Sequence, residues 1–237
     1  MDPMDTSTAL VTGANKGIGK EIARQLAGAG LTVYLGSRDA ARGRAAVAEI
    51  GGDTRLLVLD VTDAASVADA AGQVGSLDIL VNNAGISGGG RLAGEADADD
   101  FRRVYETNVF GVVTVTNAFL PALRRSPRPR IVNISSGTGS LTWATGPQLP
   151  YGGAMAAYRS SKTALNAVTV FYAYALGEPF KVNALAPGLR RTDLNPVAAA
   201  SDGDPAEAAA GAVRLALLPD DGPTGEFISW DGTPVPW

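Results

Sequence analysis

The stretch "TALVTGANKGIGKEIARQLA", residues 8–27, decides the fold. A short apolar run of strand type leads into a loop that carries Gly13, Gly17 and Gly19, and an amphipathic helical pattern follows. Glycines at such a junction let the backbone turn sharply and approach a pyrophosphate, whose charge the helix N-terminus stabilises. The alternative is a turn that serves only tight packing, but its place after the first strand favours a dinucleotide site. The loop also contains Asn15, Lys16 and Ile18, which we include in that predicted site.

Short apolar runs alternate with Ala/Gly-rich helical segments along the rest of the chain, which is typical of a parallel sheet covered on both faces. The pattern predicts strands at 8–13, 31–36, 54–60, 78–85, 130–136, 181–188 and 225–230. It predicts helices near 17–29, 39–50, 63–73, 97–106, 108–124, 156–176 and 205–218. We therefore expect an α/β fold, a Rossmann-type doubly wound parallel sheet of about seven strands, in one domain over residues 1–237.

Composition excludes several classes of function. With 46% hydrophobic and 19% charged residues, the chain has no apolar run long enough for a bilayer span, and its start lacks the pattern of an export signal, so we expect a cytoplasmic protein. A net charge of −4 and a pI near 4.9 argue against nucleic acid as a partner. Cys and His are absent, so we expect no metal site, and acid–base chemistry is left to Tyr, Lys, Asp or Glu.

The end of the second predicted strand indicates the cofactor. An NAD site presents a carboxylate there, about twenty residues past the glycines, whereas this chain has Ser37 and Arg38. Arg38 and Lys16 suit a ribose 2′-phosphate, so we predict NADP(H) as the cofactor. In the alternative reading both cations are ordinary surface residues and Asp39 binds the ribose of NAD, although Asp39 also suits the start of a helix.

Tyr158 and Lys162 stand four residues apart on a predicted helix and therefore share a face. An ammonium group beside a phenol lowers the phenol pKa, which would make Tyr158 a proton donor and acceptor. Ser136 ends the predicted strand 130–136 at the carboxyl edge of the sheet, where its hydroxyl can hold a carbonyl oxygen beside the phenol. Without that context, a Tyr and a Lys at this spacing are more simply a pair on a helix surface.

Five motifs follow one another along nearly the whole chain. They are Thr12-Gly13-x-x-x-Gly17-x-Gly19, Asn82-Asn83-Ala84-Gly85, Ser136, Tyr158-x-x-x-Lys162, and Pro187-Gly188 followed by Thr192. In this order they resemble the motif set of the short-chain dehydrogenase/reductase family, and the wording of the glycine loop resembles its carbonyl-reductase-like branch most.

The resemblance implies roles for further residues. Asn108 is similar to the Asn that anchors a water beside the lysine and completes an Asn–Ser–Tyr–Lys set, although without the family it is simply a helix N-cap. Asp60 resembles a residue that hydrogen-bonds adenine, Asn83 one that lines the adenosine side, and Thr192 one that contacts the nicotinamide carboxamide. The same motifs place Val61, Ala84, Gly85, Pro187 and Gly188 in the cofactor site.

The segment between Ser136 and Tyr158 is longer than in the commonest family members. We expect residues 139–157 to be an insertion near the substrate, with Trp143, Leu149 and Tyr151 as contacts, or else a plain surface excursion. The predicted helix that follows is apolar around most of its circumference, which indicates burial on two sides and leaves monomer and homodimer open.

The expected function is the NADPH-dependent reduction of a small ketone or aldehyde, with Tyr158 as the proton donor, Lys162 lowering its pKa and Ser136 positioning the carbonyl oxygen. Two alternatives remain open. One is an NAD-dependent alcohol dehydrogenase of the same family, and the other is a sensor or scaffold that binds the dinucleotide without reducing anything.

Overall fold

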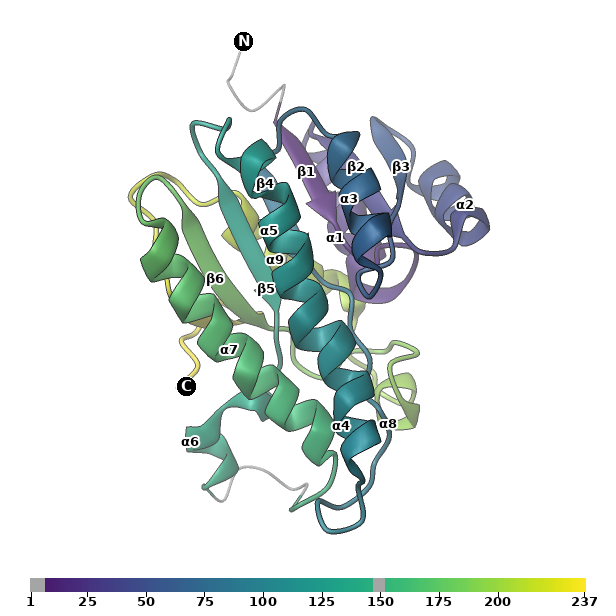
Figure 1. Cartoon of the computed structure of the whole chain (residues 1–237), viewed down its shortest axis with the longest axis vertical. Helices are drawn as coiled ribbons and strands as arrows, with labels where there is room; N and C mark the ends of the chain where they lie inside the picture. The colour runs from purple at the N-terminus through teal and green to yellow at the C-terminus, as the bar shows by residue number, and fades with distance from the viewer. Residues whose placement is uncertain (1–6, 147–151) are drawn as a thin grey trace.

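Seven strands form one parallel sheet in the order β3-β2-β1-β4-β5-β6-β7 (Figure 1). The computed structural model describes residues 7–146 and 152–237 of the chain. The predicted α/β fold is confirmed, although most strands end earlier than expected because the chain turns into loops at the carboxyl edge. The strands are β1 (Thr8–Val11), β2 (Thr32–Ser37), β3 (Thr54–Val58), β4 (Ile79–Asn82), β5 (Arg130–Ile134), β6 (Lys181–Ala186) and β7 (Phe227–Ser229).

Helices cover both faces of the sheet, and Figure 1 shows α3, α5 and α7 in front of it. The long helices are α1 (Gly17–Gly28), α2 (Ala40–Ile50), α3 (Ala64–Gly72), α4 (Ala98–Tyr105), α5 (Gly111–Leu123), α7 (Ala156–Leu176) and α9 (Pro205–Ala216). Shorter elements that the sequence pattern does not predict are a π-helical turn (Glu106–Phe110), a 3-10 turn (Gly137–Gly139), α6 (Leu141–Ala144) and α8 (Pro196–Ala199). No helix among the described residues is both long and apolar enough to cross a bilayer.

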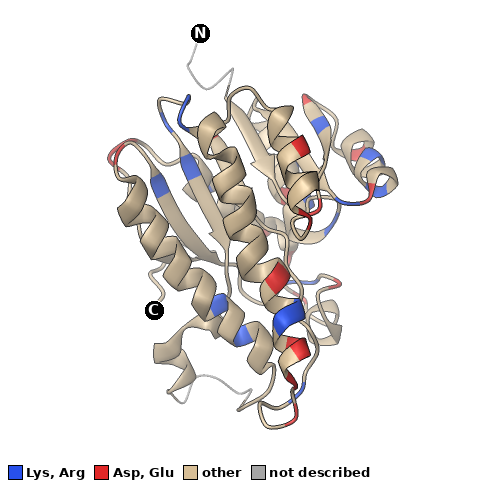
Figure 2. Cartoon of the chain, in the orientation of Figure 1, with Lys and Arg blue, Asp and Glu red and all other residues tan. Residues whose placement is uncertain are grey.

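Two hydrophobic layers sandwich the sheet because successive strand residues point to opposite faces. Ala9 and Val11 of β1 pack with residues of α1 and α9, whereas Leu10 between them packs with residues of α3 and α5. Both sides of the central strands β4, β5 and β6 are buried, as expected for parallel strands covered by helices on both faces. Charged residues gather instead on helices such as α2, which carries Arg and Glu, and α4, which carries Arg and Asp (Figure 2).

A crevice at the carboxyl edge follows from the strand order. The chain winds outward from β1 to β2 and β3, then returns so that β4 pairs with the other side of β1. Loops after β1 and β4 therefore leave the sheet in opposite directions at this switch point, which is where open α/β sheets bind ligands. The loops after β5 and β6 end at the same edge because all the strands are parallel.

A buried ladder of amides and hydroxyls joins the central strands to the helices in front. Asn82 of β4 donates from Nδ2 to Asn133 Oδ1 at 2.9 Å and to Thr116 Oγ1 of α5 at 3.1 Å. Asn133 Nδ2 in turn donates to Thr169 Oγ1 of α7 at 2.9 Å. Because buried polar groups need partners, this ladder fixes how α5 and α7 sit on the sheet.

Removing one amide from this buried ladder should destabilise the fold. We expect Asn133→Ala to lower the free energy of unfolding by about 1–3 kcal/mol, because buried groups of Asn82 and Thr169 each lose a partner. Urea unfolding followed by circular dichroism measures the change. The matched control is Asn117→Ala, whose exposed amide accepts from the Tyr172 hydroxyl at 2.8 Å and should cost less than about 0.5 kcal/mol. Equal effects at the two positions would contradict a structural role for the ladder.

Candidate active site

The glycine loop is tied to the segment that follows β4. The Thr12 hydroxyl accepts from the backbone N–H groups of Asn83 at 2.9 Å and Ala84 at 3.0 Å, and Asn83 Nδ2 donates to the Thr12 carbonyl at 2.9 Å. Gly13 has φ +62°, and a Cβ there would lie 2.9 Å from Ala84 Cα. A Cβ on Gly19 would clash with the Asn83 amide. These positions therefore require glycine for close backbone approach, not only for flexibility.

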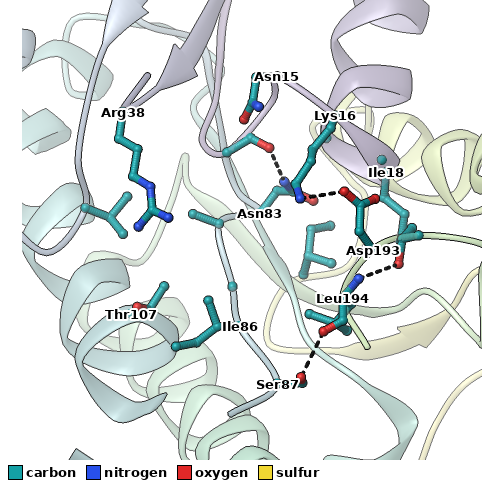
Figure 3. A pocket seen from close by; sticks show the side chains of 18 of the residues that line it. Asn15, Lys16, Ile18, Arg38, Asn83, Ile86, Ser87, Thr107, Asp193 and Leu194 are labelled. Atoms are coloured by element: carbon teal, nitrogen blue, oxygen red, sulfur yellow. Dashed lines mark hydrogen bonds and ion pairs between the residues drawn. The ribbon is translucent and has the colours of Figure 1, made fainter. Parts of the chain in front are cut away.

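A cavity of about 520 Å³ opens at this edge of the sheet (Figure 3). Most predicted cofactor residues line it, namely residues 13, 15–19, 38, 60–61, 83–85, 158, 162, 187 and 192. Other lining residues that the motifs do not single out include Leu59, Thr62, residues 86–88, Arg103, Thr107, Ile134, Ser135, Asp193 and Leu194. The size and the glycine loop fit an elongated dinucleotide, whose pyrophosphate the N-terminus of α1 would hold.

At the end of β2, the two predicted phosphate ligands Arg38 and Ser37 differ in exposure. Arg38 is exposed and points into the cavity (Figure 3). Ser37, predicted beside it, is buried and does not line the cavity, and its hydroxyl donates to the Asp39 carbonyl at 2.8 Å. The Asp39 carboxylate accepts from Ala41 N at 2.9 Å and caps α2, as the helix-start reading expects.

Lys16 lines the same cavity as Arg38 and forms an ion pair with an acidic residue. Its Nζ pairs with Asp193 Oδ2 at 2.7 Å, on the segment that follows β6. Asp60, the predicted adenine ligand, lines the cavity while its Oδ1 accepts from Thr62 N at 3.0 Å and shapes the turn after β3.

Lys162 is one of only two charged residues on α7, and it is almost completely buried. Its Nζ donates to the Ile134 carbonyl at the end of β5 at 2.8 Å. Burial in this environment lowers the pKa of the Lys162 ammonium to about 8. A buried cation with one partner at the edge of a cavity is a typical feature of a functional site.

Tyr158 lies one helical turn before Lys162, and the lysine Nζ is 5.8 Å from the centre of its ring. Burial raises the pKa of the Tyr158 phenol, and the Ser136 hydroxyl acts in the opposite direction. Burial outweighs any lowering of this pKa by Lys162, whose buried ammonium donates to the Ile134 carbonyl. At neutral pH the phenol stays protonated.

Ser136 begins the 3-10 turn that follows β5. Its Oγ lies 2.9 Å from Thr138 Oγ1 and accepts from Thr138 N at 3.2 Å. The neighbouring Ser135 lines the cavity, but its buried hydroxyl bonds to Asn166 Oδ1 of α7 at 2.5 Å. The Ser136 hydroxyl is the one that interacts with the Tyr158 phenol, although Ser136 itself is not among the residues that line the cavity.

Asn108 sits in the π-helical turn between α4 and α5 and is fully buried, so the helix N-cap reading is wrong. Its Oδ1 accepts from Ile86 N and its Nδ2 donates to the Ile86 carbonyl, both at 2.9 Å. Nδ2 also donates to Ser161 Oγ of α7 at 3.0 Å. A Cβ on Gly85 would lie 3.4 Å from Asn108 Oδ1 and 3.6 Å from Lys162 Nζ, so both side chains adjoin the same glycine.

Two further predicted site residues lie outside the lining of this cavity. Gly188 does not line the cavity; it turns the chain at φ +69°, and a Cβ there would lie 3.1 Å from Trp230. Trp143 also stays outside the cavity lining, because it packs against Gly137 and the cluster around Phe227. Leu149 and Tyr151 lie outside the described residues. Within residues 7–146 and 152–237, no group of three or more potential metal-ligating side chains comes together.

Comparisons with known proteins agree with this geometry. Residues 7–202 match the sequence model described as short chain dehydrogenase. The chain is 35% identical to salutaridine reductase of Papaver bracteatum over 296 aligned positions, which cover 92% of this chain and 93% of the relative. It is 36% identical to (−)-isopiperitenone reductase of Mentha piperita, with coverage of 94% and 96%. The structure of an NADPH-bound carbonyl reductase from chicken fatty liver superimposes with a TM-score of 0.82 at 28% identity, covering 98% of this chain and 99% of that one.

The alignment with the poppy enzyme is longer than the 237 residues of this chain, so that relative contains segments that this chain lacks. Fold, motifs and coverage nevertheless agree from the glycine loop to the segment after β6. The chain belongs to the short-chain dehydrogenase/reductase family, whose members bind a nicotinamide dinucleotide and act on carbonyl and alcohol groups, and it is carbonyl-reductase-like.

Proposed function

We propose that the chain is an NADPH-dependent carbonyl reductase that converts a small ketone or aldehyde into an alcohol, with Tyr158 as the proton donor. The observation that carries the proposal is the position of the phenol at the cavity. Tyr158 and the buried Lys162 project from α7 into the same cavity that the glycine loop lines, and Ser136 at the end of β5 lies beside the phenol. A structural pair on a helix surface would not be buried at this edge of the sheet.

The reduced nicotinamide, once bound, supplies the hydride that the carbonyl carbon accepts. The Ser136 hydroxyl exchanges its bond with Thr138 for the carbonyl oxygen and orients it towards Tyr158. The phenol then donates its proton to that oxygen as negative charge develops. Because burial raises its pKa, Tyr158 holds this proton at neutral pH, which is the state that a donor needs in the direction of reduction.

Lys162 and Asn108 act after Tyr158 has donated its proton to the carbonyl oxygen. With a pKa of about 8, the Lys162 side chain is mostly an ammonium at pH 7 and stabilises the phenolate that forms on Tyr158. Asn108 adjoins Lys162 across Gly85, which supports its predicted role of holding a water that returns a proton from solvent.

The cofactor proposal rests on Arg38. Its guanidinium is exposed within the cavity, where a 2′-phosphate on the adenosine ribose can accept two parallel hydrogen bonds. Asp39 is the residue that would bind an unphosphorylated ribose, but its carboxylate caps α2 and it does not line the cavity. The chicken carbonyl reductase with a similar fold binds NADPH, which also favours the phosphorylated cofactor.

Tyr158→Phe should abolish turnover while sparing the binding site. We expect kcat for NADPH oxidation with a panel of ketones, quinones and aldehydes to fall by about 10²- to 10⁴-fold, because the general acid is lost. NADPH affinity, measured by fluorescence titration, should stay within about twofold. Tyr172→Phe is the matched control, since it removes a hydroxyl from the same helix at a site bonded to Asn117. Full activity of Tyr158→Phe would refute the role, and binding without turnover in the unchanged protein would favour the sensor.

Arg38→Asp should reverse the cofactor preference. Loss of the charged hydrogen bonds should lower kcat/KM for NADPH by roughly 10- to 100-fold, while kcat/KM for NADH stays equal or rises. The control is Arg44→Asp, which makes the same charge change on the exposed surface of α2. An unaltered ratio would place the phosphate contact elsewhere, and faster turnover of the unchanged protein with NAD⁺ and an alcohol would favour the dehydrogenase alternative.

A further inference from the structure

Residues 192–194, here called the strap, line the cofactor cavity and contact both the glycine loop and the segment after β4. Figure 3 shows Asp193 and Leu194 of the strap beside Lys16 and Ser87, respectively. On the glycine-loop side, a Cβ on Gly17 would lie 3.4 Å from Thr192 Cγ2, so loop and strap are in contact. On the opposite side, the Ser87 hydroxyl donates to the Leu194 carbonyl at 2.9 Å. Asp193 lies between these two attachments and reaches Lys16.

The ion pair between the strap and the glycine loop is short but exposed. Lys16 Nζ and Asp193 Oδ2 are 2.7 Å apart, and the two side chains are 55% and 69% exposed. The Lys16 hydrogen bond is the largest cause of the lowered pKa of the Asp193 carboxyl, and the charge of Arg42 adds to it. The carboxylate therefore lies in contact with Lys16 of the glycine loop and within the electrostatic influence of Arg42 of α2.

A ribose 2′-phosphate is the stronger anion for such a position. A phosphate monoester carries a charge of about −1.5 to −2 at pH 7 and three acceptor oxygens, whereas a carboxylate carries one negative charge. An exposed carboxylate–lysine pair contributes little stability, so a phosphate can replace the carboxylate at small cost. Arg38, which points into the same cavity, would bind the phosphate from the other side.

We propose that Asp193 is an internal competitor for the cofactor phosphate and a specificity-determining residue of this enzyme. It neutralises Lys16 when the 2′-phosphate is absent and is displaced from Lys16 when NADPH binds, which breaks the ion pair between the strap and the glycine loop. NADH carries no 2′-phosphate and leaves the ion pair in place. The inference rests on the proposed use of NADPH.

Asp193→Asn tests the competition. We expect the variant to bind NADPH about two- to five-fold more tightly, the range that loss of an exposed ion pair spans, while its affinity for NADH changes by less than about 1.5-fold. Fluorescence titration of the protein with NADPH and with NADH gives both constants. The matched control is Asp202→Asn, which removes the same charge from an exposed position in the same connection and should leave both affinities within about 1.5-fold.

A second variant, Lys16→Gln, shows whether the effect of Asp193→Asn on NADPH affinity depends on Lys16. In Lys16→Gln, the exchange Asp193→Asn should no longer improve NADPH binding, because the residue for which the carboxylate competes is gone. An improvement that persists in Lys16→Gln, or an unchanged or weaker NADPH affinity of the single variant, would overturn the competition. If the unchanged protein binds NADPH no better than NADH, the proposed cofactor fails and the competition fails with it. A preference for NADPH without an effect of Asp193→Asn would overturn the competition alone.

Discussion

The hydrogen bond from the buried Lys162 ammonium to the Ile134 carbonyl is the interaction on which the site depends. It joins α7 to the end of β5, and so determines how Tyr158 stands relative to Ser136. The helix can approach this closely because the neighbouring loop carries Gly139, where a Cβ would lie 2.8 Å from the Lys162 carbonyl carbon. Burying an ammonium is costly unless it is paired, and this cost supports the proposed role of Lys162 in the reaction.

Two further sets of buried polar contacts, the π-helical turn and the amide ladder, help to position α7. The π-helical turn places a fully buried Asn108 where its side chain can bond to both the segment after β4 and Ser161 of α7. The ladder from Asn82 through Asn133 to Thr169 holds the same helix farther along its length. Helix α7 is therefore positioned by directional bonds as well as by apolar packing, which suits a helix that must deliver two side chains accurately.

The parts that could be predicted from sequence depend on local patterns. Alternation of apolar runs and helical segments predicts all seven strands, and the spacing of Gly13, Gly17 and Gly19 predicts the cavity that they line. The parts that could not be predicted depend on contacts between distant segments. The inward turn of the Ser37 hydroxyl, the bond between Lys16 and Asp193, and the π-helical turn at Asn108 are of this kind, because none leaves a periodic signal. The raised pKa of Tyr158 likewise follows from burial, which only the packed structure reveals.

The most direct test of this account is an NMR titration of the cofactor-free protein labelled at the lysine Cε and Nζ positions. The chain has four lysines, so a Lys162→Met variant assigns the signal of interest by its loss. The account predicts that the Lys162 signal titrates with a midpoint of about 8, since the ammonium is desolvated beneath the site. A midpoint near the ordinary lysine value of about 10.4 would contradict the burial of this side chain, and with it the positioning of Tyr158.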